Sequence, residues 1–185
     1  MIAHLNHVAI LVENITPIIQ SNLFTNSKIG QIDQFDSEGT KEVYIGEISQ
    51  SAKVLLIEAF KEGPYLNALN KRGAGLHHIA LDVLNTKKFV NQLVGTGWYL
   101  HPSSLNSYDS FKQVFLTRPN VATLIEINQV EQFENNNSYI QKLSFPFLSE
   151  KLLNGLCCKQ LIFDQKIKLF LENKTLTIQE ILKIK

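Results

Sequence analysis

Apolar and polar positions alternate along much of the chain, and the alternation predicts short strands separated by helical stretches. The first strand opens at LNHVAILV, residues 5–12, and a polar helical stretch is expected over residues 14–24. Alternation and β-branched residues then predict three further strands over residues 30–35, 41–48 and 53–60. The first part of the chain is therefore predicted to run strand, helix, strand, strand, strand.

The same order of elements returns later in the chain. LHHIALDV, residues 76–83, matches the first strand with His78 in the place of His7. A helical stretch over residues 85–94 follows, and further strands are expected over 98–101, 111–117 and 122–128. Both copies also end on the triplet Leu-Ile-Glu. A repeat of this kind indicates two similar modules that bury their apolar faces together.

The repeat divides the chain into four parts. We expect a first βαβββ module over residues 1–61, a linker helix over 62–75, a second βαβββ module over 76–130 and a C-terminal extension over 131–185. The predicted fold class is α+β, with the two paired modules forming a curved, cup-shaped mixed sheet. The extension has no counterpart in the repeat, and it would cover either an open face or an edge strand of this sheet.

Turn and cap residues refine these boundaries. In the linker, Pro64 suits the first turn of a helix, and Gly73 and Gly75 suit its end. In the extension, Thr177 and Glu180 have the spacing of a capping box and predict a short terminal helix. The rest of the extension is amphipathic and fits helix or strand equally well.

Composition excludes several classes of function. The 185 residues carry a formal net charge of +1 without a dense run of Lys or Arg, so no nucleic-acid partner is expected. No apolar stretch has membrane-spanning length and no signal-peptide pattern opens the chain, so no membrane partner is expected either. The two cysteines, Cys157 and Cys158, are adjacent and do not suit a structural disulfide, which favours a reducing cytoplasm.

The repeated histidine is the candidate for chemistry. His7 and His78 stand near the start of the first strand of each module, and the last strand of each module carries a glutamate. If the modules pair around a pseudo-twofold axis, two imidazoles and a carboxylate suit a divalent transition metal with open positions. In a regular strand, His77 would face away from His78. The repeat does not support His4 or His101 as metal ligands, and they are left unassigned.

The segments LNHVAILVENI, GAGLHHIALDV and VATLIEIN resemble the vicinal oxygen chelate superfamily, which includes glyoxalase I, bleomycin-resistance proteins and extradiol dioxygenases. The resemblance covers residues 4 to about 130, and it is closest to the methylmalonyl-CoA epimerases. It implies metal ligands at His7, His78 and Glu126. The fourth ligand position falls on Leu55 in the family register, which we favour, or on Glu58 in the register of the Leu-Ile-Glu repeat.

The resemblance also implies an activity. We expect a metal-dependent epimerase, isomerase or lyase that binds neighbouring oxygens of a small molecule, such as an acyl-CoA, and stabilises an enolate. The metal would be divalent cobalt, zinc, nickel, manganese or iron. Glu126 and Glu42 are the candidate catalytic proton carriers. An extradiol-type dioxygenase and a non-catalytic small-molecule binder with a degenerate metal site are the alternatives, and a homodimer is expected by analogy.

Overall fold

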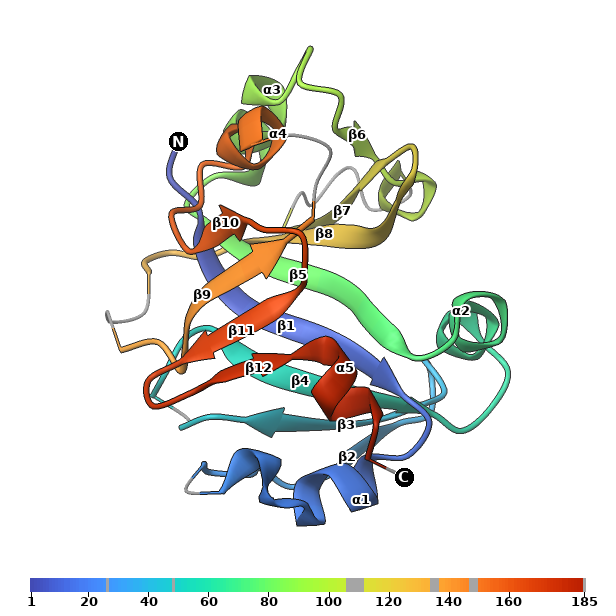
Figure 1. Cartoon of the computed structure of the whole chain (residues 1–185). Coiled ribbons are helices and arrows are strands. Elements are labelled where there is room, and N and C mark those ends of the chain that lie inside the picture. Colours follow the sequence, from blue (N-terminus) through green and yellow to red (C-terminus); the bar gives the residue numbers. More distant parts are fainter. Residues whose placement is uncertain (26, 48, 106–111, 134–136, 147–149, 185) are drawn as a thin grey trace.

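The centre of the protein is an eight-stranded mixed sheet with the strand order β2-β3-β4-β1-β5-β8-β7-β6. The computed structural model describes residues 1–25, 27–47, 49–105, 112–133, 137–146 and 150–184. Figure 1 shows the sheet curving across the molecule. Its strands are β1 (His4–Val12), β2 (Asp33–Phe35), β3 (Thr40–Ile45), β4 (Lys53–Ala59), β5 (Gly75–Val83), β6 (Tyr99–Leu100), β7 (Gln113–Arg118) and β8 (Val121–Gln129).

The two halves of this sheet are related by the repeat. The first strand of each half lies at the centre, where β1 and β5 pair antiparallel. On their outer sides, β1 pairs in parallel with β4 and β5 pairs in parallel with β8. Antiparallel β3 and β7 follow on either side. The predicted fold class, two paired βαβββ modules in one mixed sheet with a C-terminal extension, is confirmed.

The helices that follow β1 and β5 begin at asparagine caps. The side chain of Asn14 accepts a hydrogen bond from the Thr16 amide at the start of α1 (Ile15–Gln20), which a short 3-10 turn (Asn22–Phe24) follows. The side chain of Asn85 caps α3 (Thr86–Gln92) in the same way. The linker forms α2 (Pro64–Arg72), which begins at Pro64 as predicted. A further 3-10 turn (Pro102–Leu105) follows β6.

The C-terminal extension forms a second sheet that lies across one face of the first (Figure 1). Leu143, Leu169 and Ile181 of the extension belong to one buried apolar cluster together with Val8 and Ile79 of the central strands. Of the two alternatives that the sequence left open for the extension, a sheet face or an edge strand, the structure shows the sheet face. Its strand order is β10-β9-β11-β12, and its elements are β9 (Ile140–Phe145), α4 (Glu150–Gly155), β10 (Leu161–Phe163), β11 (Lys168–Leu171), β12 (Thr175–Thr177) and α5 (Ile178–Leu182).

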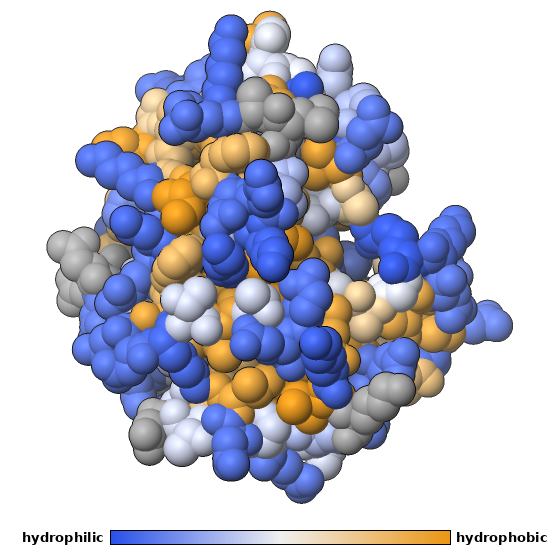
Figure 2. Space-filling view, in the orientation of Figure 1, coloured by the Kyte–Doolittle hydropathy of each residue, from blue (hydrophilic) through white to orange (hydrophobic). Residues whose placement is uncertain are grey.

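The outer side of the extension faces solvent. Figure 2 shows mostly hydrophilic side chains on this side of the molecule, with apolar side chains between them. The predicted capping box at α5 is present, because Thr177 and Glu180 bind each other's backbone amides. Both cysteines are free, with Cys157 exposed and Cys158 buried.

The expected end of one strand, Ile48, and the expected start of another, Phe111, lie outside the described residues. Among the helices of the described ranges, none is long and apolar enough to cross a membrane.

The shared core predicts that the extension stabilises the central sheet. Leu143 is 0% exposed and Leu84 is 49% exposed, so the two leucines form a matched pair. We expect Leu143→Ala to lower the free energy of unfolding by about 2–5 kcal/mol, because it leaves a cavity in the core. Leu84→Ala should change it by less than about 0.5 kcal/mol. Urea unfolding measures both values, and an equally small loss in both variants would contradict a core shared by the two sheets.

Candidate metal centre

Three neighbouring strands bring His7, His78 and Glu126 together on the face of the sheet away from the extension. The Nε2 atoms of His7 and His78 lie 3.1 Å apart. Glu126 Oε2 lies 3.2 Å from His78 Nε2 and 4.0 Å from His7 Nε2. All three side chains are buried. The residues that the sequence nominated as metal ligands therefore form one cluster whose ligand atoms could hold a metal ion.

The register of β1 and β5 explains how the two imidazoles meet. His7 lies opposite Ala80, and His78 lies opposite Ala9. Side chains that face each other across an antiparallel pair are close neighbours, so a small alanine opposite each histidine leaves room for the ring. Both alanines occupy the same place in the two copies of the repeat.

Burial sets the charge of the histidines. Burial, and then the positive charge of Lys53, lowers the pKa of His7 to about 4. Burial lowers the pKa of His78 to about 3, with His7 acting in the same direction and Glu126 opposing it. Both rings are therefore neutral at neutral pH. A neutral imidazole with a free Nε2 lone pair is the form that binds a metal.

Glu126 is held so that one carboxylate oxygen points at the histidines. Its Oε1 atom accepts hydrogen bonds from Gln113 Nε2 at 2.7 Å and from Asn128 Nδ2 at 2.9 Å. Oε2 is the atom nearest to the imidazoles. Hydrogen bonds that orient a ligating carboxylate are typical of metal sites. Sequence reasoning missed Gln113 and Asn128, which lie directly opposite each other on β7 and β8.

The donor set fits a divalent transition metal. Two imidazole nitrogens and one carboxylate oxygen are the ligands that zinc and its neighbours accept at about 2 Å. Ligands of one ion lie about 3–4 Å from each other at that bond length, and the three separations here are 3.1, 3.2 and 4.0 Å. Three protein ligands leave coordination positions for substrate oxygens or water.

Leu55 occupies the place that corresponds to Glu126 in the first half. The parallel pairing of β1 with β4 puts Leu55 beside Ala9, and the pairing of β5 with β8 puts Glu126 beside Ala80. Leu55 also lines the cavity above the cluster. The two Leu-Ile-Glu triplets therefore differ by three residues in their strand register.

Glu58 lies on the other face of β4 and serves a different purpose. Its Oε2 atom accepts a hydrogen bond from the Ile15 amide at 2.9 Å, at the start of α1. Gln129 plays the same part for the Thr86 amide at the start of α3. Glu58 therefore corresponds to Gln129 in the folded repeat.

The cluster lies at one side of a cavity of about 630 Å³. Glu42 lines this cavity, and Thr40 Oγ1 donates a hydrogen bond to its Oε1 atom at 2.8 Å. Burial raises the pKa of Glu42, and nearby carboxylates including that of Glu126 act in the same direction, while the Thr40 hydrogen bond opposes them. The wall is otherwise rich in aromatic side chains, which are Phe35, Tyr44, Tyr65 and Phe115.

The expectation that His77 faces away from His78 is wrong. The two rings are linked through their Nδ1 atoms at 2.9 Å, and both line the cavity. The reason is an irregularity in the pairing of β1 with β5, which skips His77. The two remaining histidines lie apart from the ligand atoms. His4 stacks on Phe133 at 3.9 Å, and His101 lines the cavity.

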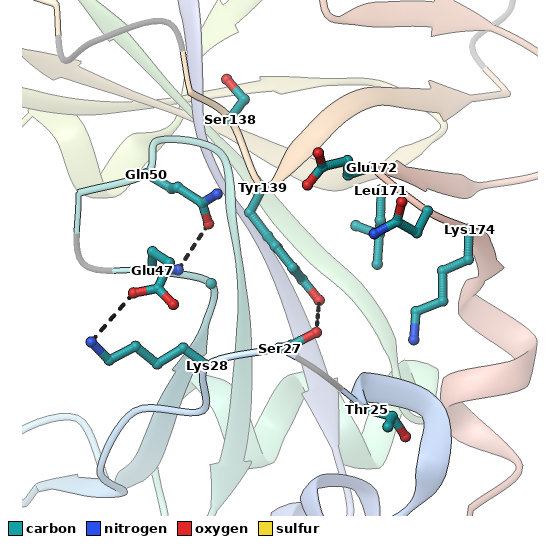
Figure 3. Close-up of a pocket in the computed structure, with 12 residues that line it drawn as sticks. Thr25, Ser27, Lys28, Glu47, Gln50, Ser138, Tyr139, Leu171, Glu172 and Lys174 are labelled. Carbon is teal, nitrogen blue, oxygen red and sulfur yellow. Dashed lines mark hydrogen bonds and ion pairs between the residues drawn. The ribbon is translucent and has the colours of Figure 1, made fainter.

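A second cavity of about 450 Å³ lies between the first half and the extension (Figure 3). Several of its polar side chains contact one another. Tyr139 and Ser27 share a hydrogen bond of 2.6 Å, and Lys28 lies 3.3 Å from Glu47. None of the three clustered ligands lines it. The chemistry is therefore expected at the first cavity.

The lowered histidine pKa values predict how the stability of the metal-free protein depends on pH. Below about pH 6.5 the unfolded chain takes up protons at its histidines, whereas folded His7 remains neutral until about pH 4. The free energy of unfolding should therefore fall as the pH is lowered from 7 to 5, by about 2 kcal/mol for His7. In His7→Gln, urea unfolding should show a fall smaller by that amount. An unchanged fall in the variant would contradict a neutral, buried His7.

Comparison with solved structures finds similar folds. A hypothetical protein from Bacillus halodurans C-125 has a TM-score of 0.56 and 20% identity over 72% of this chain and 99% of that protein. Methylmalonyl-CoA epimerase from Mycobacterium tuberculosis has a TM-score of 0.51 and 20% identity, covering 68% of this chain and 86% of that one. A variant of the Streptomyces coelicolor epimerase has a TM-score of 0.52 and 14% identity, covering 70% and 100%.

Sequence comparison adds nothing to this likeness. No protein-family model and no curated protein matches the chain. The structural matches and the paired sheet halves nevertheless confirm the resemblance at the level of the fold. The chain therefore has the fold of these solved structures, which include methylmalonyl-CoA epimerases.

Proposed function

We propose that the protein is a metal-dependent enzyme of the vicinal oxygen chelate type that moves a proton next to a carbonyl group of a small-molecule substrate. The observation that carries the proposal is the placement of Glu42, a carboxylate with a raised pKa, in the same cavity as His7, His78 and Glu126. A divalent ion held by the three clustered residues would act as a Lewis acid on a substrate oxygen.

Glu42 is the proposed base. It lies on β3, two strands away from the histidine on β1, so a substrate in the cavity would lie between Glu42 and the cluster. A raised pKa makes a carboxylate a stronger base, and a base within reach of the proton contributes about 10²–10⁴-fold to the rate. Thr40 orients the carboxylate through its hydrogen bond.

Glu126 is proposed as a metal ligand more than as a second proton carrier. Both of its oxygens are engaged, Oε1 with two amide donors and Oε2 toward the imidazoles. A carboxylate fixed in this way has little freedom to approach a substrate carbon.

An acyl-CoA is the first substrate class to test. Solved methylmalonyl-CoA epimerases of this fold hold methylmalonyl-CoA or 2-nitronate-propionyl-CoA. In this chain, Arg72 lines the cavity and offers a cation to a substrate carboxylate. The aromatic wall would pack against the acyl part. A homodimer and a cytoplasmic location remain predictions.

An extradiol-type dioxygenase is the second candidate, and Leu55 favours it. With a leucine at the place that corresponds to Glu126, the site offers two histidines and one carboxylate with open positions. Such a set is typical of non-haem Fe(II) oxygenases. Oxygen uptake by the iron-loaded protein with a catechol is the reaction that distinguishes this candidate.

Exchange of the α-proton of methylmalonyl-CoA in D₂O tests the main proposal. We expect the metal-loaded protein to incorporate deuterium, and Glu42→Gln to slow the exchange by about 10²–10⁴-fold because the base is lost. The exposed Glu62 provides a matched control, since Glu62→Gln should leave the rate unchanged. Mass spectrometry of the recovered acyl-CoA measures the exchange.

Three outcomes separate the candidates. Exchange that survives Glu42→Gln would contradict the assigned base. No exchange with any branched acyl-CoA, together with oxygen uptake by the iron form, would favour the dioxygenase. If the protein shows neither activity, and if His7→Ala and His78→Ala do not weaken ligand binding, the protein is a non-catalytic binder.

A further inference from the structure

Each histidine of the cluster is preceded by a residue that the strand pairing leaves out. Along β1 the partners pass from Leu5 to His7, so Asn6 has no partner on β5. Along β5 the partners pass from His78 to Leu76, so His77 has no partner on β1. A bulge of this kind re-aims the side chain at the extra residue. Asn6 and His77 occupy the same place in the two copies of the repeat.

Both extra residues use their altered direction in the same way. Asn6 Oδ1 lies 2.7 Å from Nδ1 of His7, and His77 Nδ1 lies 2.9 Å from Nδ1 of His78. Each one therefore contacts the ring nitrogen that faces away from the cluster. The partner of that nitrogen decides which tautomer the imidazole adopts, and so whether Nε2 offers a lone pair.

Asp82 fixes the direction of the Asn6 contact. An amide nitrogen only donates hydrogen bonds, and Asn6 Nδ2 donates one to Asp82 Oδ2 at 2.9 Å. The amide oxygen of Asn6 must then face His7, which donates from Nδ1. His7 Nε2 consequently carries a lone pair whether or not a metal is bound.

The contact between His77 and His78 has no such fixed direction, because either Nδ1 atom is able to donate. Without a cation, His78 Nε2 faces two acceptors, His7 Nε2 at 3.1 Å and Glu126 Oε2 at 3.2 Å, and it must supply the hydrogen. His78 Nδ1 then accepts from His77. With a cation on His78 Nε2, the proton is needed on Nδ1, which donates to His77.

We propose that Asn6 and His77 are positioning residues of the metal centre, with Asn6 holding His7 in one tautomer and His77 reversing its hydrogen bond when His78 binds the metal. Both of these roles rest on the proposed metal site. The exchange is balanced: His78 loses a proton at Nε2 and gains one at Nδ1, while His77 loses one at Nδ1 and gains one at Nε2. No net proton is released by this step.

Zinc affinity tests the role of His77 with a matched pair of variants. The His77 ring packs on Tyr65 with a centroid separation of 4.7 Å, so His77→Phe keeps an aromatic ring there and removes the acceptor. We expect His77→Phe to weaken zinc binding by about 10–100-fold, as loss of a ligand's supporting hydrogen bond does elsewhere. His77→Asn should retain most of the affinity, because its side-chain oxygen is able to accept from His78 Nδ1. Isothermal titration calorimetry measures the zinc affinity of both variants. Asn6→Leu should weaken zinc binding to a similar extent as His77→Phe.

Imidazole ¹⁵N NMR provides a readout that does not depend on activity. We expect His7 to carry its proton on Nδ1 in the metal-free and in the zinc-bound protein. His78 should carry it on Nε2 in the metal-free protein and on Nδ1 after zinc binds. The same His78 tautomer in both states would overturn the reversal assigned to His77.

The two proposals fail in different ways. If the wild-type protein binds zinc and His77→Phe and Asn6→Leu bind it equally well, the positioning roles are wrong and the metal site stands. If the wild-type protein binds no divalent metal, the metal site is wrong and the positioning roles fall with it.

Discussion

The antiparallel pairing of β1 with β5 is the constraint on which the rest of the structure depends. This pairing joins the two halves of the sheet and sets each histidine opposite an alanine of the other half. The parallel pairing of β8 with β5 then adds Glu126 beside Ala80. A shift of one residue in the central pair would turn one histidine to the apolar face. The burial of Val8 and Ile79 on that face under the extension opposes such a shift.

Much of this arrangement could be predicted from the sequence because the repeat keeps the histidines and the alanines in step. The strand-helix-strand order, the linker helix and the α5 capping box follow from local patterns that the tertiary structure does not override. The repeat nominated His7 and His78, and the family resemblance nominated Glu126. The extension was ambiguous because its short strands and helices bury only one side, which gives similar patterns in both kinds of element.

The parts that the sequence did not reveal depend on strand register and strand irregularity. The repeat alone suggested Glu58 as the counterpart of Glu126, whereas the strand register gives Leu55, the position that the family resemblance favoured. His77 was expected to face away because a regular strand alternates its side chains, and a bulge breaks that alternation. Gln113 supports Glu126 only across a strand pair, so no local signal marks it.

Burial determines the protonation of the candidate metal centre. It lowers the pKa of both imidazoles, which keeps them neutral, and it raises the pKa of Glu42. Neutral imidazole nitrogens and a carboxylate oxygen that converge in a buried place favour a cation. The most direct measurement is the anomalous diffraction of a crystal grown with cobalt. The account predicts one ion bound by His7 Nε2, His78 Nε2 and Glu126 Oε2, and a cobalt ion bound elsewhere, or none, would contradict it.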